Sequence, residues 1–233
     1  MARETHTYIH IPKTGGTALK YVLEEHNRER KLTPRIAMSQ TGHFQRLHTL
    51  PANSNACFII RHPLERFCSG FWERATMERR RELKESVYTG VQSFGYKDFN
   101  DLEQEILREC KTPDEFLSFL HKEIHTHKNV DPMPALFELT QSLTHWLGDL
   151  ETFKRLEHKI KMVFHINNLD KVMSEVYDIE LPKDPFRKRS RELFDIPQSY
   201  EISTANRIWF ERIFRKQDYE LISYIKTRPY YYA

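Results

Sequence analysis

The stretch Thr7-Tyr8-Ile9-His10-Ile11-Pro12-Lys13-Thr14-Gly15-Gly16-Thr17 decides the fold of this chain. Its first five residues are mostly β-branched or aromatic, which favours a β-strand. The strand pattern stops at Pro12, and the lysine and paired glycines that follow favour a tight loop. Apolar residues at helical spacing in residues 18–25 then predict a helix directly after the loop. The order strand, glycine loop, helix is typical of an α/β protein.

This glycine loop is suited to binding an anion. Free backbone N–H groups and the helix dipole favour negative charge at a helix start, and glycines let the backbone close around a phosphate. Lys13 adds a mobile cation, and Thr14 and Thr17 add hydroxyl donors. The loop is not a Walker A motif, because Lys13 precedes the glycines. An ordinary strand-to-helix turn, with glycine needed only for its geometry, is the alternative.

A second motif has the same order of strand and helix. Residues 56–60 predict a strand, and residues 64–83 predict a helix. Arg61 lies at the carboxyl end of this strand, where open α/β sheets bind ligands. Ser69 lies about two helical turns further on, where its hydroxyl is placed to share a phosphate with Arg61. The alternative is that Arg61 and Arg66 pair with surface carboxylates.

The rest of the chain continues the alternation of strands and helices. Residues 161–166 predict a third strand, whereas residues 32–55 and 181–197 have an irregular pattern. Helical patterns recur in residues 101–110, 113–122, 169–177 and 200–226. Residues 230–232, three tyrosines, either pack or fray. We therefore expect an α/β fold with a parallel sheet covered by helices on both faces, in a single domain of residues 1–233.

Composition limits the classes of partner. The chain has 36 Lys and Arg residues against 33 Asp and Glu residues, a net charge of +3, which suits an anionic ligand but does not indicate nucleic acid. Three dispersed cysteines, Cys57, Cys68 and Cys110, fit neither a disulfide framework nor a zinc site. The chain has no apolar stretch of about 18 residues and no signal-peptide core at its start. We expect a cytoplasmic protein without a membrane span, or a Golgi protein if an anchor has been removed.

Residues 12–17, together with Arg61-x-Pro63-x-x-Arg66-x-x-Ser69, resemble the sulfotransferases that use 3′-phosphoadenosine 5′-phosphosulfate (PAPS). The pattern is closest to the carbohydrate sulfotransferases of the heparan sulfate 2-O and 6-O type and their microbial and viral relatives. Weaker similarity in residues 134–146, 164–169 and 216–221 extends the resemblance over most of the chain. His62, where many relatives carry Asp, and residues 181–184, where relatives often carry Asn, depart from it. The resemblance implies a P-loop NTPase-like parallel sheet flanked by helices.

The resemblance also implies a site and a reaction. The first motif would bind the 5′-phosphosulfate, through Lys13, Thr14, Gly15, Gly16, Thr17 and Ala18. Arg61 and Ser69 would bind the 3′-phosphate, and the product would be 3′,5′-ADP. Lys13 would stabilise the leaving phosphate oxygen during in-line transfer, and no metal is expected.

The acceptor hydroxyl needs a base, and His43 is the candidate. It lies between the two motifs, and relatives of the 2-O type carry a Gly-His there whose His is the base. A surface or capping role is the alternative for His43. His48 and His10 are the other candidates, and His10 is expected to face the sheet. The resemblance favours a carbohydrate acceptor.

Two other functions stay open at this point. A nucleotide kinase or other phosphoryl transferase would need carboxylates for Mg²⁺, and a nucleotide- or glycan-binding module would have no catalysis. The basic run in residues 187–191 is either a lid over the ligand or a solvated loop.

Overall fold

The computed structural model describes residues 5–16, 19, 35–38, 44–82, 101–126, 141–180 and 200–232. The chain divides into two compact units. The first unit comprises Met1–Pro63, Ser142–Phe186 and Arg215–Ala233, and the second comprises Leu64–Gln141 and Arg187–Phe214.

The first unit is built on a parallel sheet of five strands in the order β2-β1-β3-β4-β5. The strands are β1 Thr5–Tyr8, β2 Arg35–Met38, β3 Ala56–Ile60, β4 Ile160–His165 and β5 Tyr231–Tyr232. All five residues of β3 are buried, as expected for a central strand of a sheet with helices on both faces. The predicted α/β class with a parallel sheet is confirmed.

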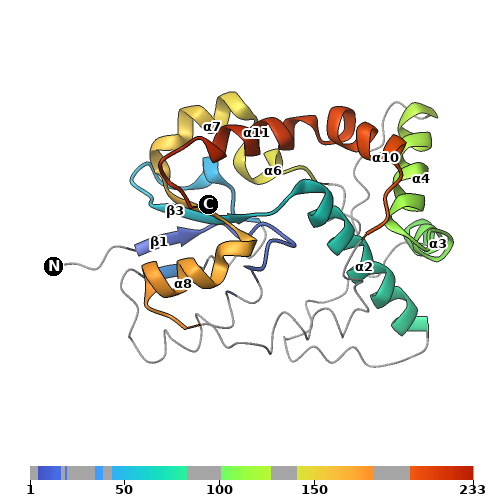
Figure 1. The fold of residues 1–233 in the computed structure, drawn as a ribbon, viewed down its shortest axis with the longest axis horizontal. Helices are drawn as coiled ribbons and strands as arrows, with labels where there is room; N and C mark the ends of the chain where they lie inside the picture. The colour runs from blue at the N-terminus through green and yellow to red at the C-terminus, as the bar shows by residue number, and fades with distance from the viewer. Residues whose placement is uncertain are drawn as a thin grey trace. The chain divides into compact units, whose positions relative to one another are not determined.

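Helices cover both faces of this sheet (Figure 1). The helical elements of the first unit are η2 Leu47–Thr49, α6 Thr144–Leu147, α7 Leu150–Leu156, η4 Glu157–Lys159, η5 Ile166–Asn168, α8 Leu169–Tyr177 and α11 Lys216–Lys226. Figure 1 shows α8 on one face and α7 with α11 on the other. Because neighbouring side chains of a strand point to opposite faces, Cys57 and Ile59 join the core under α8. Phe58 points the other way and meets the Phe153 ring edge-on at 6.5 Å.

The second unit is helical and has an aromatic core. Its helices are α2 Pro63–Glu82, α3 Asp101–Glu109, α4 Pro113–Thr126 and α10 Thr204–Trp209, with a π-helical segment, η6 Phe210–Phe214. Phe67 of α2 stacks on Phe116 of α4 at 5.7 Å and lies 5.4 Å from Phe210. Asp114 joins α4 to α10, because its Oδ1 accepts hydrogen bonds from the Ser203 N–H at 2.9 Å and Asn206 Nδ2 at 2.8 Å.

Several predicted elements are confirmed, and a few are corrected. The strands predicted at residues 56–60 and 161–166 are present as β3 and β4. The helices predicted near residues 64–83, 101–110, 113–122 and 169–177 are present as α2, α3, α4 and α8. The first strand runs from Thr5 to Tyr8, earlier than predicted, because its partner β2 ends opposite Tyr8 at Met38. The stretch predicted as irregular, residues 32–55, contains β2 and η2. The end of the chain is held in place, since the backbone of Tyr231 and Tyr232 pairs with β4 and the Tyr230 hydroxyl donates to Glu157, although the Tyr232 side chain is exposed.

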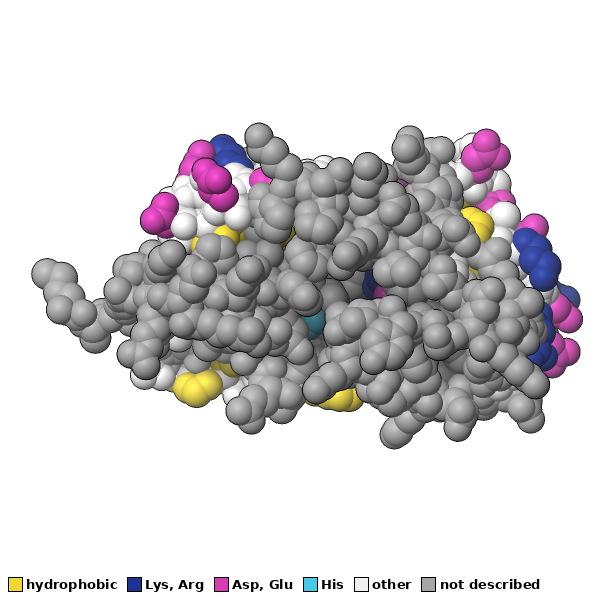
Figure 2. All heavy atoms as spheres, turned by 90° about the horizontal axis from the view of Figure 1, so that it is seen from below, with side chains coloured by type: hydrophobic (Ala, Val, Ile, Leu, Met, Phe, Trp, Pro, Cys, Tyr) yellow, Lys and Arg dark blue, Asp and Glu magenta, His cyan; other side chains and the backbone are white. Residues whose placement is uncertain are grey.

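The charged surface is mixed in sign. On the face seen in Figure 2, Lys and Arg side chains of the described residues lie among Asp and Glu side chains. Helix α2, with 20 residues, ends in the charged run Glu78-Arg79-Arg80-Arg81-Glu82. In the part of the chain that the structure describes, no helix combines the length and apolar character needed to cross a membrane.

Candidate functional site

The strand order creates a binding position between β1 and β3. From β1 the chain goes to β2 on one side and then returns to β3 on the other side. In open parallel α/β sheets, ligands bind at such a reversal, outside the carboxyl ends of the strands. The loop of residues 12–16 follows β1, and Arg61 follows β3 directly. The glycine loop and Arg61 therefore lie next to the position that the topology favours for a ligand.

A side-chain contact joins the two motifs. The Arg61 guanidinium donates a long hydrogen bond, 3.4 Å, from Nη1 to the carbonyl oxygen of Lys13. Both residues are half-buried. This contact joins the side chain of Arg61 to the backbone of Lys13, so the loop after β1 and the end of β3 meet at one edge of the sheet.

The loop backbone is bent in an unusual way. Lys13 has a φ of 64° and Gly15 a φ of 90°. The left-handed region is rare for residues other than glycine and costs roughly 1–2 kcal/mol at Lys13. Backbone that enters this region at turn positions can direct successive N–H groups into an anion-binding concavity. Strain of this kind is concentrated at functional sites.

A helix begins at the end of the loop. Gly16 has helical conformation, and the Leu19 N–H donates to the Gly15 carbonyl at 3.1 Å, which is the first bond of a helix. The predicted order of strand, loop and helix start is thus confirmed. The Thr14 hydroxyl is buried and donates to the Ile11 carbonyl at 2.8 Å, so in this structure it holds the loop together. Thr17 and Ala18 lie outside the described residues.

His10 lies across the start of this helix. A Cβ added at Gly16 would come within 2.1 Å of His10 Cδ2 and 2.2 Å of His10 Nε2. The ring also lies 5.9 Å from the ring of Tyr8. The expectation that His10 faces the sheet is therefore incomplete, because its ring edge contacts the glycine loop.

A cationic cluster lies in the segment after His43, which itself lies outside the described residues. Arg46 Nη2 lies 3.2 Å from His145 Nε2. Since a guanidinium can only donate, this contact requires that His145 Nε2 accept. Burial lowers the pKa of His145, and the positive charges of Arg46 and His48 lower it further. Phe44, next to this cluster in the sequence, is 72% exposed.

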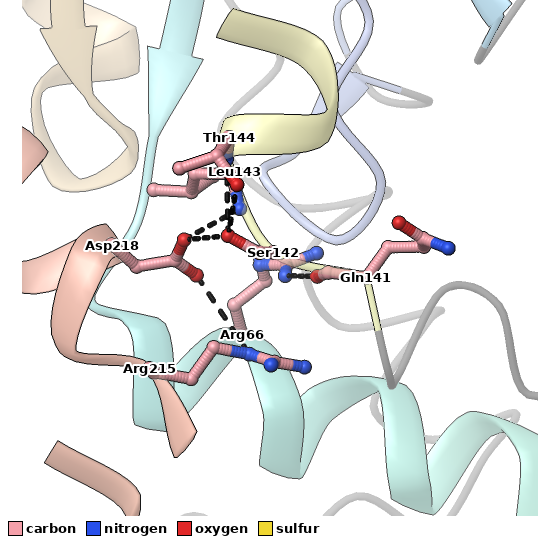
Figure 3. Close-up of polar contacts among 7 residues, drawn as sticks. All are labelled: Arg66, Gln141, Ser142, Leu143, Thr144, Arg215 and Asp218. Atoms are coloured by element: carbon pink, nitrogen blue, oxygen red, sulfur yellow. Dashed lines mark hydrogen bonds and ion pairs between the residues drawn. The ribbon is translucent and has the colours of Figure 1, made fainter. Parts of the chain in front are cut away.

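A buried carboxylate holds α6 to α11 (Figure 3). Asp218 is fully buried and accepts hydrogen bonds from the Leu143 N–H at 2.7 Å and from the Ser142 hydroxyl. Its other oxygen lies 3.8 Å from Nε of the buried Arg215. Sequence reasoning noted residues 216–221 and Ser142 only as weak matches and did not predict this joint. Because Asp218 is fully buried and pairs with groups of α6 and with Arg215, the joint stabilises the packing of α6 against α11.

Arg66 and Ser69 belong to the second unit. Arg66 is buried, and its guanidinium donates to the carbonyl oxygen of Gln141 (Figure 3). The alternative that places Arg66 on the surface is therefore wrong. Ser69 is 7% exposed and lies on α2. The basic run of residues 187–191 lies outside the described residues.

These features define an α/β protein with a glycine loop at the reversal point of a parallel sheet. The sequence matches the sulfotransferase family over residues 3–232. The chain therefore belongs to the sulfotransferase family, and the resemblance to its carbohydrate-type members fits this assignment. Membership makes it a transferase of sulfuryl groups with a hydroxyl-bearing acceptor. No curated protein and no solved structure matches the chain.

Proposed function

We propose that this sulfotransferase takes the sulfuryl group from PAPS and transfers it to a hydroxyl of a carbohydrate by in-line displacement. The contact between Arg61 and the Lys13 carbonyl carries the proposal. It joins the loops after β1 and β3 at the reversal point of the sheet. PAPS is anionic at both ends of its nucleotide, and each of the two loops brings a cation.

The glycine loop would hold the 5′-phosphosulfate. The ligand-facing groups in this proposal are the backbone N–H groups of residues 14–18 and the ammonium group of Lys13. The positive φ angles of Lys13 and Gly15 and the helix start at Gly16 support it. During transfer, charge builds on the leaving phosphate oxygen. The Lys13 ammonium would stabilise that charge, and such preorganised groups are worth several kcal/mol of barrier.

The 3′-phosphate would be bound by Arg61 and Ser69. The position of Arg61 directly after β3 supports its part. Arginine is well suited to this role because its planar guanidinium binds two phosphate oxygens at once. Ser69 would add one hydroxyl donor.

His43 would accept the proton of the acceptor hydroxyl. The segment that follows it is tied to α6 through Arg46 and His145, which supports a fixed position for the chain after His43. An unperturbed histidine has a pKa near 6.5, which suits proton transfer at neutral pH. The exposed Phe44 ring offers a flat apolar surface for a sugar ring, and Arg46 and His48 favour an acceptor with acidic groups.

Thermal denaturation with nucleotides tests this function. Ligands that bind only the folded state raise the melting temperature with concentration above Kd. We expect 3′,5′-ADP to raise it without Mg²⁺, and ATP to have a smaller effect with or without Mg²⁺. A shift only with ATP and Mg²⁺ would instead indicate a kinase. Binding of 3′,5′-ADP with unchanged sulfuryl transfer in Lys13→Ala would contradict the assigned role of Lys13.

A further inference from the structure

The two glycines of the loop serve different purposes. Gly15 has a φ of 90°, a conformation that side-chain-bearing residues rarely adopt. Gly16 does not have a positive φ, so its backbone conformation does not require glycine. Glycine is required there because of the space beside it: a Cβ at Gly16 would lie 2.1 Å from His10 Cδ2, 2.2 Å from Nε2 and 3.1 Å from Cε1.

The backbone that carries His10 is fixed beside the sheet. Its neighbours in the chain, Ile9 and Ile11, are fully buried. The Ile9 N–H donates to the Cys57 carbonyl at 2.9 Å, which fixes the backbone beside β3. The ring of the fully buried Tyr8 lies 5.9 Å from that of His10. The backbone of His10 is therefore fixed against β3, and its ring lies in the space beside Gly16.

We propose that His10 is a positioning residue for the sulfate donor. Its imidazole fills the side-chain space of Gly16 and fixes the first turn of the helix, and with it the N–H groups that receive the phosphosulfate. The proposal rests on the function proposed above. Fixed donors stabilise an anion more than mobile ones, because no binding free energy is spent on ordering them.

Four proteins test this inference: the wild type, His10→Ala, Gly16→Ala and the double variant. Their Kd for 3′,5′-ADP is measured by calorimetry, and their melting temperatures are measured alongside. We expect His10→Ala to weaken binding by ~10–100-fold, the range for a misplaced binding group, with a smaller relative change in kcat than in KM for PAPS. Gly16→Ala should weaken binding more. The double variant should bind more tightly than Gly16→Ala, because the methyl group occupies the space that the ring has left.

Three further variants serve as controls. Gly15→Ala should not be rescued by His10→Ala, because its defect is the backbone angle and its nearest contact is Ile166 Cδ1, at 3.2 Å. His158→Ala removes an exposed histidine elsewhere in the first unit and should leave Kd unchanged. His10→Phe keeps a planar ring and should bind closer to the wild type than His10→Ala does.

Two results would overturn the inference. One is a His10→Ala protein that melts at a lower temperature but binds 3′,5′-ADP like the wild type, which would make His10 merely structural. The other is a double variant no better than Gly16→Ala. If Gly16→Ala does not fold, the Kd values of His10→Ala and His10→Phe for 3′,5′-ADP are compared instead. Equal Kd values for these two variants would overturn the inference.

Failure of the proposed function gives a different result. If the wild type does not bind 3′,5′-ADP, the proposal that PAPS is the donor is refuted. The role of His10 is then tested by measuring the binding of inorganic pyrophosphate to the same four proteins. Rescue of pyrophosphate binding in the double variant would support His10 as a positioning residue of the anion loop. Equal affinities in the four proteins would overturn it.

Discussion

Two polar regions of the first unit, the joint of α6 with α11 and the loop after β1, differ in how their polar groups are paired and in their backbone conformation. At the joint of α6 and α11, Asp218 accepts two hydrogen bonds and lies beside the cation Arg215, all in buried surroundings. At the loop after β1, the Arg61 guanidinium contacts the carbonyl oxygen of Lys13, and Lys13 has a left-handed backbone. Paired charges and hydrogen bonds stabilise a fold, whereas backbone strain lowers stability and is concentrated at functional sites. The difference supports a role in stability for the joint and a role in the proposed donor site for the loop.

The largest expected change is in stability, at the joint. Asp218→Ala leaves the Arg215 guanidinium buried without this counter-charge and removes an acceptor from the Leu143 N–H. Loss of one partner of a buried ion pair costs about 3–5 kcal/mol. Urea unfolding should show this loss, whereas Glu175→Gln on the exposed side of α8 should show little change. A stable Asp218→Ala protein without donor binding would place Asp218 in the site and contradict the comparison.

Lys13→Ala should lower activity strongly and the free energy of unfolding little, the opposite of Asp218→Ala. Removal of one charge-stabilising group costs about 10²–10³-fold in kcat, while the free energy of unfolding should stay close to that of the wild type. Lys13→Gly should be equally inactive but more stable than Lys13→Ala, because glycine adopts the left-handed φ without strain. Sulfuryl transfer assays and urea unfolding measure the two effects. A Lys13→Ala protein that is active but unstable would make Lys13 a structural residue.

Arg61→Ala should weaken nucleotide binding without a large effect on the fold. Charge-assisted hydrogen bonds are worth about 1.5–3 kcal/mol, so Kd for 3′,5′-ADP should rise by about 10–100-fold. Adenosine 5′-phosphosulfate, which lacks the 3′-phosphate, should bind the wild type and Arg61→Ala alike. Calorimetric titration with both nucleotides would show an equal loss for both if Arg61 does not contact the 3′-phosphate.

The smallest expected effect is a pH dependence at the Arg46–His145 contact. The pKa of His145 is lowered in the folded protein, first by burial and then by Arg46 and His48. The unfolded chain therefore binds the proton more readily, so this contribution is complete above the ordinary pKa of 6.5 and decreases as the pH falls below it. Urea unfolding of wild type and His145→Gln at pH 7.5 and 5.5 should show a smaller pH effect in the variant. An equal effect in both would contradict the assignment.

Much of the architecture could be predicted because it depends on local patterns. The buried strand β3, the strand β4 and the helix α8 follow from runs of apolar residues and from helical spacing. The four-residue strand β2 was missed because it is too short to show a period, and its pairing with β1 depends on a contact between distant residues. The family assignment followed from the two motifs and agrees with the match over residues 3–232.

The sequence by itself determined the strand, the loop, the helix start and the family, since these follow from residue types at fixed spacing along the chain. Only the tertiary structure decided that β1 and β3 are neighbours and that Arg61 touches the Lys13 carbonyl. It also decided that His10 occupies the space beside Gly16 and that Asp218 binds the start of α6. Local propensity acts over a few residues, whereas these contacts depend on how the whole chain buries its apolar surface. Distant side chains meet only after that burial is complete.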